Sequence, residues 1–546
     1  MRLVDRRIGL LFGLFLVAFA LIAMRALWLD TVKAGSLRQR ALSQQSQDIT
    51  VSAKRGSILD RDGNPLAVSE DSASIYADPL LIKNPAQVAY RLSAVLGLPT
   101  NQLLGKLADR SRGFVYLARK VDIDKGKAVD KLKLYGVGTL TEPRRRYPQG
   151  SLASQVLGTV GTDNYGLSGL ESYFDKRLRG TDGEEQVVRD GVGRPVSIVM
   201  KKQALPGQDL RLTLDAAIQE RVEAVLAGVG QTYRPKGATA LVLNPRNGSI
   251  LALANWPRVD ANDPGSAPAY AQQDRAVTNL YEPGSTFKAV TVSGALQDKL
   301  ITPSTPFYLP PTIKVADRTI GDAEPRGAET LPVSQILAQS SNVGAVKIGL
   351  RLGATRFDKW VRAFGFGQPT GVDLPGESPG IVLKPSQYSG SSLGNLPIGQ
   401  GEAVTPMQMA AAYSAIANNG VMVRPHIVDG DSAPAHRVIK KTTARAVSKM
   451  LEGVLAPGGT APEATVPGYV LAGKTGTAQK PDGKGGYSDT KFVASFVGFA
   501  PARNPRLLVA VMVDEPQGDI YGGSVAAPAF QKIVSFALPY LKIPPN

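Results

Sequence analysis

The chain has 546 residues, a formal net charge of +17, two histidines and no cysteine. Its 43% hydrophobic and 20% charged residues are sufficient for large cores and exclude a disordered chain. The absence of cysteine excludes disulfides, thiol catalysis and cysteine-ligated zinc. His426 and His436 each lie close to a proline in loop-like sequence, so we expect both to be ordinary surface residues rather than catalytic or metal-binding ones.

The positive charge is spread along the chain, and no nucleic-acid-binding motif accompanies it. We therefore expect a solvated basic surface, with some attraction to anionic lipids or polymers, and no nucleic-acid partner.

The N-terminus predicts a single membrane anchor. Residues 8–24 carry no charge, and the apolar character continues past Arg25 to residue 29, which gives the roughly 20 residues that a span requires. Arginines 2, 6 and 7 precede this run, so the positive-inside rule places a tail of residues 1–7 in the cytoplasm and the remaining chain outside. A cleaved signal peptide is the alternative. Its small-x-small site at residues 18–20 lies inside the apolar run, which favours an uncleaved anchor at residues 8–29.

Residues 30–205 form a mixed, polar region that ends near Pro206-Gly207. An Asp-Gly turn predicts a β-hairpin at residues 55–67. We predict helices at residues 37–47, 85–96, 101–107 and 166–178, and extended chain at residues 184–200.

Residues 206–546 predict an α+β domain whose sheet joins both ends of the segment. An Asn-Gly turn between residues 238–243 and 250–254 indicates a hairpin, and helices are expected throughout residues 285–366. Further strands are predicted at residues 210–214, 469–478, 492–499 and 507–513, and helices at residues 216–226 and 527–541.

Ser285 and Lys288 form an S-x-x-K pattern at a predicted helix start. Positions i and i+3 share a helix face, so the amine of Lys288 can reach the hydroxyl of Ser285. A buried lysine with a lowered pKa, aided by a second cation such as Lys474, can act as the base that the histidine-poor sequence otherwise lacks. A second copy of the pattern, Ser488 with Lys491, lies in loop or strand sequence, where the two side chains need not face each other.

Ser340 and Asn342 interrupt the helical region. The hydroxyl can relay a proton, and the amide can fix the lysine or the substrate; an ordinary helix cap is the alternative.

Lys474, Thr475, Gly476 and Thr477 form a K-T-G-T sequence at a predicted strand end. The two hydroxyls and the lysine can bind a carboxylate, and the glycine can admit a peptide backbone. The N–H groups of Ser285 and Thr477 are candidates for an oxyanion hole. A strand end with an exposed lysine is the alternative.

The order S-x-x-K, S-x-N, K-T-G resembles the class B penicillin-binding proteins. Further matching segments lie at residues 55–67 (R-G-x-I-x-D-R-x-G), 169–171 (G-L-E), 399–401 (G-Q-G) and 496–501 (F-V-G-F-A-P). Gln155 departs from the pattern, because many relatives carry histidine there.

This resemblance implies an anchor, an elongated mixed α/β pedestal at residues 30–205, and a C-terminal transpeptidase domain at residues 206–546 with an antiparallel sheet flanked by helices. It implies a bacterial cytoplasmic-membrane enzyme without metal or organic cofactor. In this family a serine, here Ser285, attacks D-Ala-D-Ala stem peptides, an amine from a second stem resolves the acyl-enzyme, and β-lactams acylate the same serine. No glycosyltransferase module is evident.

The sequence before Ser285 most resembles the division-specific, FtsI-type branch, which implies an FtsW-type lipid II polymerase and other divisome proteins as partners. An elongation-specific enzyme is the alternative within the family. A β-lactam sensor needs a signalling module, for which the tail before residue 8 is too short, and a β-lactamase needs rapid deacylation but no pedestal. A non-catalytic scaffold would tolerate loss of the catalytic residue types, all of which this chain retains.

Overall fold

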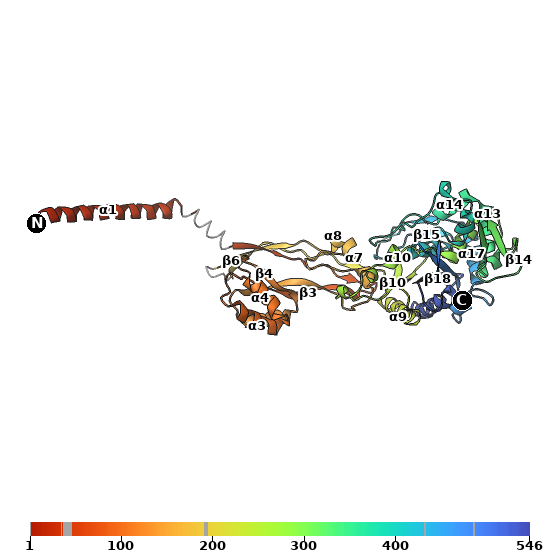
Figure 1. The fold of residues 1–546 in the computed structure, drawn as a ribbon, viewed down its shortest axis with the longest axis horizontal. Coiled ribbons are helices and arrows are strands. Elements are labelled where there is room, and N and C mark those ends of the chain that lie inside the picture. Colours follow the sequence, from red (N-terminus) through yellow and green to blue (C-terminus); the bar gives the residue numbers. More distant parts are fainter. Residues whose placement is uncertain are drawn as a thin grey trace. The chain divides into compact units, whose positions relative to one another are not determined.

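The computed structural model describes residues 2–33, 35, 46–189, 195–430, 433–483 and 486–545; Figure 1 labels its helices and strands. The chain divides into two compact units, neither of which is one continuous segment. The first unit comprises Met1–Lys54, Glu70–Arg144 and Arg179–Gly207, and the second comprises Arg55–Ser69, Arg145–Leu178 and Gln208–Asn546.

Helix α1 (Arg2–Thr31) contains the predicted anchor. Among the described residues it is the one helix long and apolar enough to cross a membrane, with 26 residues in Arg6–Thr31 and a hydropathy of 2.5. At 1.5 Å per residue this stretch is about 39 Å long, more than the ~30 Å hydrocarbon core of a bilayer. Its apolar side chains are exposed, and the guanidinium of Arg25 lies 4.6 Å from the ring centroid of Trp28, a pair that suits a membrane interface.

The rest of the first unit, where the structure describes it, combines β-strands with the helices α3, α4 and α5. The predicted helix at residues 85–96 is confirmed as α3 (Pro85–Leu96), which begins with Asn84 as its cap and ends at Gly97 in the left-handed conformation. With α4 (Thr100–Ala108) and α5 (Ile123–Lys131) it covers a core that includes Leu92, Leu103 and Leu117. The strands of this part are β3 (Pro65–Ala77), β4 (Val115–Val121) and β5 (Val137–Arg146).

The extended chain predicted at residues 184–200 is two strands. These are β6 (Gly183–Arg189) and β7 (Pro195–Lys202), which pair antiparallel and form a three-stranded sheet with β1 (Ser46–Val51). The helix predicted at residues 37–47 lies almost entirely outside the described residues, and its last two residues belong to β1.

The second unit contains a five-stranded antiparallel sheet whose strands come from both ends of the segment, which confirms the predicted topology. The order is β10-β9-β19-β18-β17. The strands are β9 (Gly237–Leu243), β10 (Ile250–Trp256), β17 (Ala472–Pro481), β18 (Tyr487–Ala500) and β19 (Leu507–Asp514). Every residue of β9 and β19 is buried, as expected for inner strands that are covered on both faces.

Helices cover this sheet on both sides (Figure 1). The terminal helix α19 (Ala527–Tyr540), predicted at residues 527–541, packs with α9 (Ala216–Tyr233) against β18, β19, β9 and β10. Helix α16 (Pro406–Ala417) packs against β19, and α17 (Lys441–Glu452) packs against α16 and β17. Helices α11 (Lys288–Gln297), α13 (Asn342–Leu352) and α14 (Ala354–Ala363) pack against one another.

Several predicted boundaries were wrong. The region expected to be helical contains two small two-stranded sheets, β11 with β14 and β12 with β13, because prolines at residues 303, 306, 310 and 311 exclude a helix there. Strand β8 is only Leu210–Arg211, and the helix expected at residues 166–178 breaks at Phe174 into α7 (Gly169–Tyr173) and α8 (Asp175–Leu178). The strands of the two small sheets are β11 (Pro306–Leu309), β12 (Thr312–Val315), β13 (Arg318–Gly321) and β14 (Glu329–Pro332).

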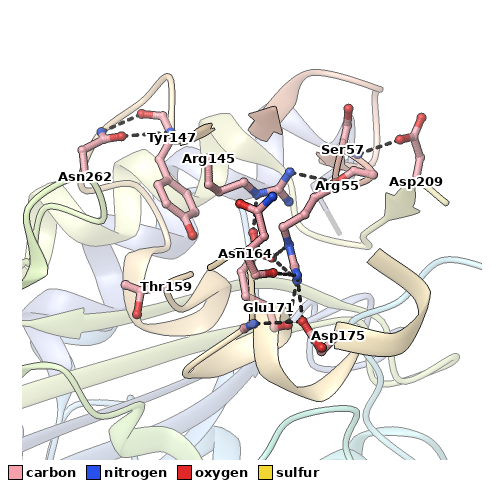
Figure 2. A network of polar contacts seen from close by, with 12 residues as sticks. Arg55, Ser57, Arg145, Tyr147, Thr159, Asn164, Glu171, Asp175, Asp209 and Asn262 are labelled. Atoms are coloured by element: carbon pink, nitrogen blue, oxygen red, sulfur yellow. Dashed lines mark hydrogen bonds and ion pairs between the residues drawn. The ribbon is translucent and has the colours of Figure 1, made fainter. Parts of the chain in front are cut away.

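The predicted hairpin at residues 55–67 is confirmed and leads to a buried ion cluster in the second unit. Strand β2 (Ile58–Leu59) pairs antiparallel with β3 around Gly63, whose φ is +91°. Figure 2 shows Arg55 and Arg145 converging on Glu171. Arg55 and Glu171 are 2.7 Å apart and their side chains are at most 1% exposed. The family-like segments at residues 55–67 and 169–171 therefore have a structural role in the fold.

Candidate active site

Ser285 lies in a tight turn that leads into helix α11 (Lys288–Gln297). The turn is a 3-10 helix, η3 (Gly284–Phe287), and Gly284 has a φ of +55°, a conformation that glycine adopts without strain. A Cβ on Gly284 would lie 3.2 Å from that of Ala478, so η3 packs directly on β17. The first and third sequence motifs are therefore in contact.

Lys288 is the first residue of α11 and is only 1% exposed. Its Nζ donates to the carbonyl of Ser340 and to Oδ1 of Asn342, each at 2.6 Å, and lies 3.2 Å from Ser340 Oγ. Burial lowers the pKa of Lys288 from 10.5 to about 7; Asp322 opposes this effect and Arg326 adds to it. A substantial fraction of the amine is thus neutral near pH 7, as a general base requires.

The expected contact between Lys288 and the Ser285 hydroxyl is not formed. Within the described part of the chain, Ser285 Oγ has no hydrogen bond, because the amine is directed at Ser340 and Asn342 instead. A neutral amine has two N–H donors and one lone pair, so these two acceptors leave the lone pair available for a proton. Catalytic hydrogen bonds often tighten only when substrate binds, and Ser285 is the adjacent hydroxyl on the cleft side.

Ser340 and Asn342 lie where α12 (Val333–Ala338) gives way to α13 (Asn342–Leu352), but neither is the helix cap. The cap is Ser341, whose Oγ accepts from the N–H of Gly344. Ser340 has a φ of +61°, which is uncommon for a residue with a side chain, and its carbonyl is bonded to Lys288. Asn342 Nδ2 donates to the carbonyl of Gly321 at 2.9 Å, which fixes Oδ1 as the end that faces the lysine.

Asp322 is a residue of this site that the sequence analysis missed. Its Oδ1 accepts from Ser341 Oγ at 3.1 Å and from the N–H of Val343 at 3.0 Å, so it binds the N-terminus of α13, where the helix dipole favours an anion. Its charge also favours the protonated form of Lys288. A lone aspartate after a short strand has no spacing signature that could have identified it.

Lys474 is the third residue of β17 rather than part of its C-terminal end, because the strand begins at Ala472 and continues to Pro481. It is fully buried, and its Nζ lies 3.2 Å from Thr475 Oγ1. Burial, and then the neighbouring Lys288, lower the pKa of Lys474 well below 10.5. An arriving carboxylate would favour the protonated amine again.

Thr475 and Thr477 both line the cleft, and both hydroxyls have protein partners. Thr475 Oγ1 lies 2.7 Å from Thr460 Oγ1, and Thr477 Oγ1 accepts from the N–H of Gly522 at 3.0 Å. A hydroxyl that accepts one bond keeps its hydrogen to donate, so Thr477 can still bind a carboxylate. Strand β17 is an edge of the sheet.

The space beside Gly476 is filled by the protein itself. A Cβ there would lie 2.4 Å from Ser495 Oγ and 3.0 Å from the carbonyl of Pro283. The reason that the sequence suggested for this glycine, room for a substrate, is therefore replaced by a packing reason: β17 and the Ser285 turn approach closely at this point.

The cleft is a cavity of about 900 Å³ that joins the three motifs. Lys288, Lys474 and Gly476 lie behind its wall. The lining includes Ser285, Ser340, Asn342, Thr475 and Thr477, together with the charged side chains of Arg318, Asp322, Glu324, Arg326 and Glu463.

The second S-x-x-K pattern has a different setting. Ser488 lies in β18, where its exposed Oγ accepts from the N–H of Lys491 rather than from the lysine side chain. The surface position expected for His426 was wrong: it is 5% exposed and bonds Ser249 Oγ through Nε2 at 3.2 Å, whereas His436 is exposed. In the described ranges, no group of three or more His, Asp or Glu residues could hold a metal ion.

Two family descriptions match the chain. The penicillin-binding protein transpeptidase domain matches residues 238–535, and the penicillin-binding protein dimerisation domain matches residues 50–212.

Individual relatives match over almost the full chain. It is 34% identical to stage V sporulation protein D of Bacillus subtilis, over 98% of this chain and 86% of the relative, and 32% identical to peptidoglycan D,D-transpeptidase FtsI of Escherichia coli K12, over 100% and 93%. A crystal structure of penicillin-binding protein 3 from Mycobacterium tuberculosis in complex with aztreonam superposes with a TM-score of 0.71 at 30% identity, over 91% of this chain and 98% of that one.

Proposed function

Because the chain belongs to the class B penicillin-binding proteins, which carry a peptidoglycan transpeptidase domain, we propose that it crosslinks stem peptides through an acyl-enzyme on Ser285. The observation that supports this most directly is the buried amine of Lys288. It is held by Ser340 and Asn342 beside the cleft that Ser285 lines, with a pKa near 7.

The proposed reaction begins when the neutral amine of Lys288 accepts the proton of Ser285 Oγ as this oxygen attacks the carbonyl of the penultimate D-Ala. The N–H groups of Ser285 and Thr477 stabilise the oxyanion. As the C–N bond breaks, the proton returns through Ser340 Oγ, 3.2 Å from Lys288 Nζ, to the departing amine of D-Ala. An amine of a second stem then attacks the ester, forms the crosslink and restores the Ser285 hydroxyl.

Substrate binding is assigned to the K-T-G-T strand. The terminal carboxylate of the donor peptide would accept from the hydroxyls of Thr475 and Thr477 and would raise the depressed pKa of Lys474, so that the lysine gains a proton on binding. A β-lactam carries an equivalent carboxylate and would acylate Ser285 in the same position.

For the cellular role we propose septal synthesis, with a tail at residues 1–7 in the cytoplasm, an anchor at residues 8–29 in the inner membrane, a pedestal at residues 30–205 and a transpeptidase domain at residues 206–546 outside. The apolar helix α1 and the relative named FtsI support this proposal. An FtsW-type lipid II polymerase would supply the glycan strands. Depletion tests the role: filamentous cells support division, and rounded cells support elongation instead.

The chemical proposal is tested by intact-mass measurement after exposure to a penicillin. We expect a stable adduct on the wild type and on Ser488→Ala, and none on Ser285→Ala. An adduct on Ser285→Ala would exclude Ser285 as the nucleophile, absence of any adduct would favour a scaffold, and an adduct that disappears rapidly would favour a β-lactamase.

A further inference from the structure

The turn that presents Ser285 is clamped to a second segment of the chain. Residues 281–284 run antiparallel to residues 399–404, and three backbone hydrogen bonds join them. Tyr281 and Val404 exchange bonds of 3.0 and 2.9 Å, and the N–H of Gly284 donates to the carbonyl of Gly399 at 2.9 Å. A Cβ on Gly399 would lie 2.2 Å from the carbonyl oxygen of Gly284, so the two segments are in direct contact.

One glutamate from each segment lies between these backbone bonds. Oε1 of Glu282 accepts from the N–H of Gly401 and from Tyr487 Oη, both at 3.0 Å. Glu402 is 3% exposed. Oε2 of Glu282 and Oε1 of Glu402 are both buried and have no hydrogen-bond partner among the residues described.

Two buried acceptor oxygens without a donor destabilise the folded state, because neither recovers the hydrogen bonds that it makes with water. A proton on one of the two carboxyl groups supplies a donor and removes one negative charge. If Glu402 is a carboxylic acid, its O–H supplies a donor, and Oε2 of Glu282 on the facing segment is an acceptor that has no other partner among the described residues. The electrostatics agree, because burial and then the charge of Glu282 raise the pKa of Glu402 well above 4.5, and burial raises that of Glu282.

No lysine or arginine of the described chain is paired with either carboxyl group. The other titratable groups that face the two carboxyls are the phenols of Tyr388 and Tyr487. Arg318 is close enough to Tyr487 to lower the pKa of its phenol, but within the described chain no ion pair joins either glutamate to a lysine or arginine. A proton is therefore the simplest counter-charge available to the pair.

We propose that Glu402 is a protonated carboxylic acid that donates a hydrogen bond to Glu282, and that this acid pair is a positioning device for the turn that carries Ser285. Neither residue touches the reacting atoms; they act by joining residues 281–284 to residues 399–404. The positioning role rests on Ser285 being the nucleophile, whereas the acid pair itself does not.

The proposal has a defined pH sign. The folded-state pKa of Glu402 lies above its unfolded value, so the stabilisation is complete below about 4.5 and is lost as the pH rises through the folded-state value. Above that value two buried carboxylates repel each other and the clamp opens. Acylation of the wild type should then decline on the alkaline side, by up to about tenfold per pH unit, the limit for one ionisation.

Infrared spectroscopy tests the acid pair without requiring activity. We expect the full-length wild type at neutral pH to show the carbonyl band of a protonated carboxyl group, which disappears as the pH is raised. Glu402→Gln should lack this band, and Glu220→Gln, the same change at an exposed carboxylate on α9, should retain it. A wild type without the band at neutral pH, or a band that persists in Glu402→Gln, would overturn the acid pair.

Acylation rates against pH test the positioning role. Glu402→Gln keeps an N–H donor that cannot ionise, so it should retain acylation at alkaline pH where the wild type loses it; Glu402→Ala should be slower at every pH. An alkaline decline in Glu402→Gln equal to that of the wild type would overturn the positioning role. If Glu402→Gln does not fold, the pH titration of the wild-type infrared band still decides whether the acid exists. A penicillin adduct on Ser285→Ala, together with an intact wild-type band, would instead refute Ser285 as the nucleophile and leave the acid pair standing.

Discussion

Two charged neighbours of Lys288 should move the pH dependence of acylation in opposite directions. Asp322 favours the protonated amine and Arg326 disfavours it. We therefore expect Asp322→Asn to lower the pKa of Lys288 and to move the rising, acid limb of the acylation rate to lower pH. Arg326→Gln removes a positive charge, so it should raise this pKa and move the same limb to higher pH.

The magnitude follows from the position of the lysine. At a pKa of about 7, half of the amine is neutral at pH 7, whereas at the ordinary value of 10.5 about one molecule in 3000 would be. The difference of 10.5 − 7 = 3.5 corresponds to about 5 kcal/mol against the charged form. Burial is the largest cause, so each charge substitution should move the midpoint by less than burial does, by roughly 1 pH unit, the lower end of the shift that one nearby charge produces.

The assay is the second-order rate of acylation by a fluorescent penicillin, measured from about pH 5 to about pH 9. Arg318→Gln is the matched control, because it removes a positive charge from the wall of the same cleft without facing Lys288. Asp322 also binds the N-terminus of α13, so thermal unfolding should be recorded in parallel. Loss of its charge there should lower the unfolding free energy by about 1 kcal/mol.

Shifts in the same direction for Asp322→Asn and Arg326→Gln would refute the electrostatic reasoning. Lowered rates with an unchanged midpoint would show that the titrating group on the acid limb is not Lys288, and a shift in Arg318→Gln as large as that in Arg326→Gln would show that the net charge of the cleft, rather than these two contacts, sets the midpoint.

Three further predictions concern the framework of the site and its anchor. Arg55→Met removes one ion-pair partner of the buried Glu171, so the unfolding free energy of the second unit should fall by about 3–5 kcal/mol. The control, Arg112→Met at an exposed ion pair, should change the unfolding free energy measured with denaturant by less than about 1 kcal/mol. Equal effects would contradict the importance of the buried cluster. Gly476→Ala places a methyl group 2.4 Å from Ser495 Oγ and should lower both the melting temperature and the acylation rate. The control, Gly228→Ala on the exposed face of α9 with open space around it, should stabilise the protein by about 0.5–1 kcal/mol. A Gly476→Ala variant of normal stability would show that β17 can move away from the Ser285 turn. A chain that lacks residues 1–33 should pass from the membrane to the soluble fraction on cell fractionation and still form the penicillin adduct; retention in the membrane would point to a second attachment.

The sequence predicted the elements whose signals are local. Helix α3 has its proline in the first turn and a glycine after its end, and the hairpin of β9 and β10 surrounds an Asn-Gly turn. The same holds for the motifs, because a spacing of three residues already places Ser285 and Lys288 in one turn. The sheet topology was also predictable, because β9 and β19 are almost entirely apolar, as strands buried on both faces are.

What the sequence did not predict depends on contacts between distant segments. The amide orientation of Asn342 and the position of the Asp322 carboxylate depend on the β12–β13 hairpin, which lies in a region predicted to be mainly helical. The positive φ of Ser340 accompanies a carbonyl that is bonded to Lys288, a residue far from it in the chain. Gly476 gave a correct signal of close approach, but the approaching atoms belong to Ser495 and Pro283, far from it in the chain. Spacing rules carry no information on such partners.

The chemistry of the site depends on burial more than on residue identity. Lys288 and Lys474 are buried behind one wall of the cleft, where neither can easily keep a full charge. Beside the turn that carries Ser285, Glu402 is buried and Glu282 is half-buried. The amines become bases because water is excluded, and by the same argument a carboxyl becomes a proton donor. An exposed lysine or glutamate at any of these positions would have its ordinary pKa and neither property. A variant that admits water to this region should therefore impair acylation even if every motif residue is retained.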